Sequence, residues 1–142
     1  MSAPHNLQRF VEAQEGVFDQ ALAELQAGDK QSHWMWFVFP QLAGLGRSPT
    51  AQHFALRSAE EASCYLQHPL LGARLRQCTQ ALLPWQGRRT AEQILGPIDT
   101  MKLRSSLTLF DALEPGGVFG QTLDAFFDCP DEQTLALLQQ SE

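Results

Sequence analysis

The chain has 142 residues, a length that suits one domain with a sizeable hydrophobic core and is too short for two comfortable domains. Hydrophobic residues make up 44% of it, and its three cysteines are too few and too widely spaced for a disulfide framework. The formal net charge of −6 argues against general nucleic-acid binding, because such binding requires a basic surface.

The sequence contains no segment typical of export or membrane insertion. Residues 1–6 have no basic segment followed by an apolar run, so we expect no secretory signal. No apolar stretch approaches the ~20 residues that a helix needs to cross a bilayer. We therefore expect a cytoplasmic protein with reduced thiols, folded as a single helical domain over residues 1–142 with an ordered core over about 6–139.

Apolar side chains at intervals of three and four residues mark the N-terminal region as helical. This spacing over residues 7–25 predicts one helix, or two helices that separate near Gly16. A further helix is predicted from Ser32, a suitable N-cap, to the residue before Pro40. Residues 34–39 are apolar on nearly every side and form a short run, so a buried strand is the alternative there.

The rest of the chain contains a series of helix-start signals. They predict helices that begin at or close to Pro49, Ser58, Pro69, Thr90, Asp99, Phe119 and Asp131. No pair of alternating apolar runs is separated by a hairpin turn. We therefore predict an all-α fold, a compact single-domain array of about seven to nine short helices.

Two polar groups in the first third of the chain are candidates for a ligand site. Gln14 places an amide inside an apolar stripe, where it needs a hydrogen-bond partner in the backbone or in a ligand. Lys30 and His33 directly precede Trp34 and Trp36, and such a set suits a ligand with a flat ring and a negative charge. The structural alternative is that the tryptophans fill the core and the lysine is solvated.

The long helix of the C-terminal half carries an unusual density of hydrogen-bond donors. Ser106 lies three residues after Leu103 and four before Phe110, on the same inward face as both. Lys102 and Ser105 lie beside it in the sequence. A phosphate or a ribose would use such donors, but serines equally suit a close contact between two helices.

Basic residues gather in the middle of the chain. Residues 47–104 contain eight of the ten basic residues and four acidic ones, whereas residues 105–142 contain seven acidic residues and no basic one. The acidic helices could simply pack beside the basic segment, or the basic segment could form an anion-binding surface. The loop at residues 44–48, with Arg47 before a helix start, has the parts of an anion site but lacks the preceding strand of nucleotide-binding folds.

Standard catalytic motifs are missing from the sequence. It contains no Walker loop, dinucleotide fingerprint, nucleophile elbow or zincin motif. Cys64 and His68 are spaced by four residues, but two ligands do not make a zinc site. We therefore predict no metal site and no cofactor.

Two stretches are long enough to be specific: His-Trp-Met-Trp-Phe at residues 33–37 and Lys-Leu-Arg-Ser-Ser-Leu-Thr-Leu-Phe at residues 102–110. Together with residues 10–14, 30–41, 44–46 and 65–72, they make the chain resemble the uncharacterised bacterial family filed as domain of unknown function 1810. The resemblance extends from Leu7 to Leu138, with Leu107 standing where methionine is expected. It implies a compact, mainly helical domain, and it implies no activity because none is established for the family.

The first functional hypothesis is a site for a small anionic ligand, phosphorylated or nucleotide-like, with hydrolase-type chemistry as a further option. In this hypothesis His33 is the general acid or base, and the ligand is bound by Gln14, Lys30, Trp34 or Trp36, Arg47, Lys102, Ser105 and Ser106. It predicts that Gln14, His33, Trp36, Lys102 and Ser106 line one cavity.

The second hypothesis is a non-enzymatic domain for protein–protein interaction or scaffolding. It predicts a local hydrogen bond for each of those polar side chains and an exposed apolar patch as a docking surface. The sequence does not decide whether the protein is an enzyme, and it predicts no particular protein partner.

Overall fold

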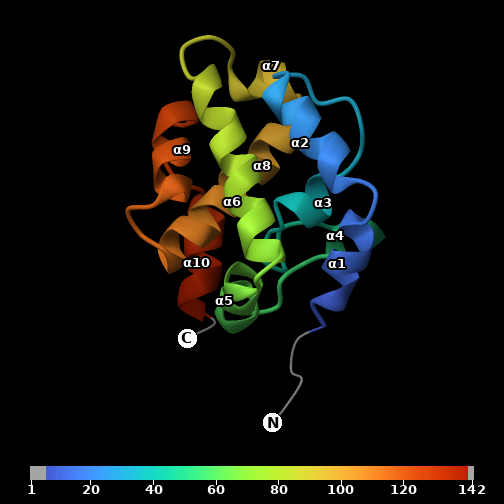
Figure 1. The fold of residues 1–142 in the computed structure, drawn as a ribbon. Coiled ribbons are helices and arrows are strands. Elements are labelled where there is room, and N and C mark those ends of the chain that lie inside the picture. The colour runs from blue at the N-terminus through green and yellow to red at the C-terminus, as the bar shows by residue number, and fades with distance from the viewer. Residues whose placement is uncertain (1–5, 141–142) are drawn as a thin grey trace.

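The computed structural model describes residues 6–140, which form helices joined by short connections (Figure 1). The helices are α1 (Gln8–Gln14), α2 (Phe18–Gln26), α3 (Met35–Val38), α4 (Pro49–His53), α5 (Ala59–Gln67), α6 (Leu71–Leu82), the 3₁₀ helix η1 (Leu83–Trp85), α7 (Ala91–Leu95), α8 (Pro97–Leu113), α9 (Val118–Phe126) and α10 (Glu132–Gln140). The all-α class is confirmed for these residues, among which Leu42 and Leu56 form an isolated bridge and no strand occurs. The N-terminal residues where no secretory signal is expected lie largely outside the described range.

The number of helices is higher than predicted. Residues 6–140 contain ten α-helices instead of seven to nine. The N-terminal stripe is divided at Gly16, whose φ of 71° is a left-handed conformation that ends a helix and that glycine adopts without strain. The strand considered for residues 34–39 is also wrong, because Met35–Val38 forms a single helical turn.

Some predicted caps are confirmed and others are wrong. Ser58 and Thr90 accept hydrogen bonds from backbone amides at the starts of α5 and α7. The caps predicted at Ser32 and Asp99 are wrong, because α3 and α8 begin without a side-chain cap. Ser32 instead donates to the Glu24 carboxylate of α2, and Asp99 forms an ion pair with Lys30.

Helices α6 and α8 lie at the centre of the helical array (Figure 1). Helix α8 packs against α5, α7, α9 and α10, while α6 packs against α2, α5 and α9. The inward face of α8 buries Leu103, Leu107 and Phe110 almost completely. Full burial of one such side chain contributes about 1.5–3 kcal/mol, so this face is a main source of the stability that holds α8 in place. No helix in residues 6–140 is both long enough and apolar enough to cross a bilayer.

Candidate functional site

A hollow of about 380 Å³ opens where α8 begins, and we call it the α8 hollow. Its lining residues are Lys30, His33, Met35, Trp36, Leu95, Gly96, Pro97, Ile98, Asp99 and Lys102. The structure thus brings together four residues that the sequence singled out, from two segments far apart in the chain: Lys30, His33, Trp36 and Lys102. Its size lies within the range of about 300–1,000 Å³ that is usual for small-molecule sites.

Two lysines share one carboxylate in the wall of this hollow. The Nζ atom of Lys30 lies 2.8 Å from Oδ2 of Asp99, and Nζ of Lys102 lies 3.7 Å from Oδ1 of the same residue. The side chains are 7%, 22% and 19% exposed for Lys30, Lys102 and Asp99. Partial burial weakens solvent screening of these charges, and two cations beside one anion leave an excess positive charge.

Both lysines also lie against tryptophan rings. Lys102 Nζ is 4.8 Å from the centroid of the Trp36 ring, and Lys30 Nζ is 5.0 Å from that of Trp34. Trp36 is half-buried, whereas Trp34 has no exposed surface. Only Trp36 can therefore contact a ligand, while Trp34 supports Lys30 from the core.

A buried carboxylate fixes the segment that carries these residues. Glu24 accepts hydrogen bonds from the backbone amides of Gln31 and Ser32, from the Ser32 hydroxyl and from the Trp34 indole, at 2.6–3.1 Å. Burial alone would raise the pKa of Glu24, but the bonds from Ser32, Gln31 and Trp34 outweigh it and lower the pKa from 4.5 to about 2. The carboxylate is therefore ionised at neutral pH and holds residues 31–34 in one conformation.

The first turn of α8 adds backbone donors to the same hollow. The amides of Ile98 and Asp99 have no acceptor within the part of the chain that the structure describes. Such free amides, together with the helix dipole, favour an anion at the start of a helix. Asp99 offsets part of this effect, because its own negative charge lies in that first turn.

His33 lines the hollow at its exposed edge. Among residues 6–140 no hydrogen-bond or ion-pair partner contacts its imidazole. A general base is normally oriented by a third group that fixes its ring and tautomer. The arrangement around His33 is therefore suited to contact with a ligand, and it lacks the oriented base of a nucleophilic site.

Gln14 lies outside the hollow, and its amide is used by the fold. Its Nε2 donates to the carbonyl of Phe37 at 2.7 Å and lies 3.2 Å from the Tyr65 hydroxyl, while Arg74 donates to its Oε1 at 3.2 Å. Gln14 is only 1% exposed, so these bonds join α1 to α3, α5 and α6 inside the core. The predicted convergence of Gln14 with the lysines is wrong.

Three other predicted ligand residues also lie elsewhere. Ser106 is completely buried and its hydroxyl has no hydrogen-bond partner, so its predicted place in the cavity is wrong too. Ser105 donates to the carbonyl of Met101 and to Asp131, at 3.2 and 2.9 Å. Arg47 is exposed in the loop before α4 and does not line the α8 hollow.

A second hollow of about 230 Å³ adjoins the first, and we call it the α10 hollow. Its lining residues are Gln41, Leu45, Gly46, Ile98, Met101, Lys102, Arg104, Ser105, Asp131 and Gln133. Ile98 and Lys102 line both hollows, because they lie four residues apart on the exposed face of α8. Sequence reasoning missed this second hollow, which is assembled from three separate segments without a shared motif.

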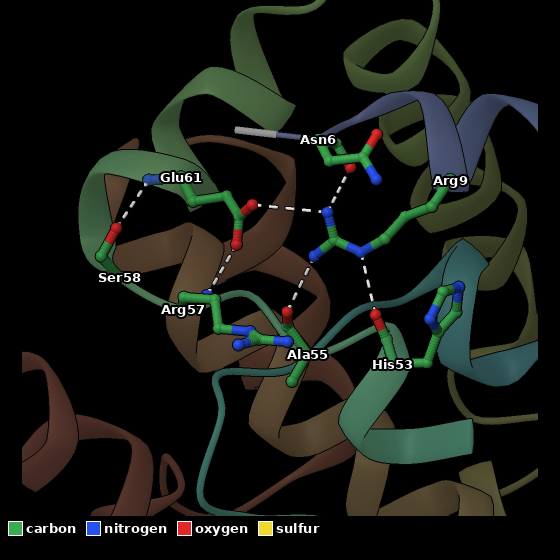
Figure 2. A network of polar contacts seen from close by, with 7 residues as sticks. All are labelled: Asn6, Arg9, His53, Ala55, Arg57, Ser58 and Glu61. Atoms are coloured by element: carbon green, nitrogen blue, oxygen red, sulfur yellow. Dashed lines mark hydrogen bonds and ion pairs between the residues drawn. The ribbon is translucent and has the colours of Figure 1, made fainter. Parts of the chain in front are cut away.

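A cluster around Arg9, which sequence reasoning also missed, is structural (Figure 2). The guanidinium of Arg9 donates to the carbonyls of His53 and Ala55, each at 2.9 Å, and to that of Asn6. It also contacts the Glu61 carboxylate at 3.4 Å, with side-chain exposures of 10% and 4% for Arg9 and Glu61. Because these donors are engaged by the chain itself, the cluster joins α1 to α5 and to the connection after α4.

Comparison with known proteins confirms the family resemblance. The model of a family described as a protein of unknown function, DUF1810, matches residues 4–138. The chain is similar to the conserved hypothetical protein Rv1873 from Mycobacterium tuberculosis, whose crystal structure matches with a TM-score of 0.92 and 48% sequence identity. That match covers 96% of this chain and 98% of the other. No curated protein is significantly similar in sequence. The chain is thus a member of the DUF1810 family.

Proposed function

We propose that the α8 hollow binds a small organic anion, phosphorylated or nucleotide-like, through Lys30 and Lys102. The observation that supports this most strongly is the sharing of Asp99 by the two ammonium groups, at 2.8 and 3.7 Å. Lys102 is the more exposed of the two, so a ligand reaches it first. An anion there forms a charge-assisted contact in a partly desolvated position, where such contacts are strong.

The apolar part of the ligand lies against Trp36 and Ile98. Trp36 is half-buried and Ile98 is 71% exposed, so covering both removes apolar surface from water. The ammonium of Lys102 lies over the Trp36 ring, which places the charge of the ligand next to its ring. This juxtaposition favours a molecule that carries an aromatic group and an anionic group near one another.

Binding is the function we propose, and hydrolysis is a separate option that depends on His33. The imidazole lines the hollow without an orienting group among the described residues, which supports binding more than turnover. Release of inorganic phosphate from ADP, measured in the same mixtures as binding, separates the two. Release that disappears in His33→Ala would make the protein a hydrolase.

The test is titration calorimetry and thermal unfolding with inorganic phosphate, AMP and ADP. A ligand at 100 times its Kd adds about 2.7 kcal/mol of stability, which is a shift of several degrees for a domain of this size. Lys102→Met keeps the apolar stem against Trp36 and removes the charge, so we expect affinity to fall about tenfold or more. Arg88→Met is the matched control, since Arg88 lies 4.7 Å from the Trp85 ring and outside the hollow. Equal affinity in wild type and Lys102→Met would refute the proposal.

One observation favours the alternative, a protein-interaction domain. Ile98 and Met101 are each 71% exposed on neighbouring positions of α8, which is unusual for large apolar side chains. Docking through this patch would weaken in the double variant Ile98→Ser/Met101→Ser and would persist in Lys102→Met. Anion binding, in contrast, would weaken in Lys102→Met, so these two variants distinguish the two functions.

A further inference from the structure

The α8 hollow and the α10 hollow meet at Lys102 and Ile98. Ile98 and Lys102 line both, so a molecule bound at the Lys102 ammonium is in reach of either hollow. The α10 hollow measures about 230 Å³, below the range of about 300–1,000 Å³ for independent small-molecule sites. It is therefore better suited to hold one end of a longer ligand than to hold a ligand alone.

The polar groups of the α10 hollow suit hydroxyl groups more than anions. Oδ2 of Asp131 accepts from the Ser105 hydroxyl at 2.9 Å and from the amide of Thr134 at 3.3 Å, whereas Oδ1 has no partner among residues 6–140. The side-chain amides of Gln41 and Gln133 also have no partner within that range. A free carboxylate oxygen and two amides offer several acceptors and donors to neutral hydroxyls.

The cation at this end of the surface, Arg104, is held in place by backbone carbonyls. Arg104 donates through Nε to the carbonyl of Cys129 at 3.0 Å and through one terminal nitrogen to that of Pro130 at 2.8 Å. These bonds to neutral carbonyls fix the guanidinium and leave its charge intact, so the surface has one cation between the two hollows, Lys102, and one at its far end, Arg104. The order along the surface is an apolar ring wall, the Lys102 ammonium, and a set of hydroxyl-binding groups beside the Arg104 guanidinium.

We propose that the two hollows together bind one extended ligand, a nucleoside diphosphate joined to a sugar. The aromatic base contacts Trp36 and Ile98, the diphosphate contacts Lys102, and the sugar hydroxyls bond to Asp131, Gln41 and Gln133. This inference rests on the proposed function of the α8 hollow and extends it to a second subsite. It assigns a ligand class in which neither the nucleotide nor the sugar phosphate alone makes all the contacts.

The test compares matched pairs of ligands by titration calorimetry: ADP with ADP-glucose, and UDP with UDP-glucose. We expect one sugar nucleotide to bind about tenfold more tightly than its nucleoside diphosphate, the gain of two or three net hydrogen bonds. The variant Gln41→Ala/Gln133→Ala should abolish this tenfold gain and leave affinity for the nucleoside diphosphate unchanged. Gln139→Ala, an exposed glutamine on the same helix α10, is the matched control and should bind like wild type.

The outcomes separate this inference from the proposed function. Equal affinity for the two members of each pair, with no effect of the double variant, would overturn this inference. If ADP or UDP still bound in a Lys102-dependent way, the proposed function would stand. Failure of all four nucleotides to bind, or binding that does not depend on Lys102, would overturn both. Circular dichroism of the double variant tests that it is folded, and its unchanged affinity for the nucleoside diphosphate tests the same point independently.

Discussion

The buried carboxylate of Glu24 provides a quantitative test of how the α8 hollow is built. The substitution Glu24→Gln keeps the shape of the side chain and removes its charge. Because the hydrogen bonds from Ser32, Gln31 and Trp34 outweigh burial and lower the pKa of Glu24 from 4.5 to about 2, the folded state prefers the ionised form. A group with a lowered pKa stabilises the fold above its unfolded pKa, and this stabilisation is lost as the pH falls toward its folded pKa.

The magnitude follows from these two pKa values. A difference of about 2.5 at about 1.4 kcal/mol for each pKa unit gives on the order of 3 kcal/mol of stabilisation at pH 7. By about pH 3.5 the unfolded carboxyl is mostly protonated, and roughly 1.4 kcal/mol of this stabilisation is lost. The variant Glu24→Gln has no carboxyl group to titrate at this position. The difference in unfolding free energy between wild type and variant should therefore shrink by this amount between pH 7 and about pH 3.5.

Urea denaturation followed by tryptophan fluorescence measures this difference at about pH 7 and pH 3.5. Comparing wild type with the variant at each pH cancels the titration of all other carboxyl groups. Glu12→Gln, at an exposed position of α1, is the matched control and should show no such change. A wild-type advantage over Glu24→Gln that is the same at both pH values would refute the assignment of an ionised, strongly hydrogen-bonded carboxylate.

Three further substitutions test other parts of the fold by the same urea denaturation at pH 7. Arg9→Met should destabilise the protein by about 3 kcal/mol, because it removes a buried cation from Glu61 and from three carbonyls; a loss below about 1 kcal/mol would contradict this. Ser106→Ala should be neutral or stabilise by up to about 1 kcal/mol, because its buried hydroxyl has no partner; a clear destabilisation would indicate one. Gly28→Ala should destabilise by more than about 1 kcal/mol, since φ is 68° and the new Cβ would lie 2.7 Å from Trp85 ring carbons; wild-type stability would show that both strains are relieved.

The helices could be predicted from the sequence because they depend on local information. Caps such as Ser58 and Thr90 act within three residues, and periodic apolar side chains identify the buried face of a helix. The sequence wrongly predicts Asp99 as a helix cap, because its carboxylate instead pairs with Lys30, a residue far away in the sequence. A long-range ion pair therefore decides the role of a side chain that local rules assign to a cap.

The candidate site was predictable in its residue types and only partly in its geometry. Lys30, His33, Trp36 and Lys102 were identified because charged and aromatic groups stand beside apolar runs, and the structure brings them into one hollow. Gln14 and Ser106 carry the same sequence signal, a polar residue in an apolar stripe, yet both lie in the core. This signal identifies a buried polar group. Whether that group bonds to the backbone, as Gln14 does, or has no partner, as is the case for Ser106, depends on how the chain folds.

The sharing of Asp99 explains how a hollow can attract anions without weakening the empty protein. Without Asp99, the two lysines that contact it would repel one another and would carry the cost of partial desolvation. With one carboxylate between them, each ammonium has a partner, yet the sum of charges stays positive. Glu24, the other ionised carboxylate of this region, is engaged by hydrogen bonds from residues 31–34, so Asp99 is the carboxylate that the two lysines share.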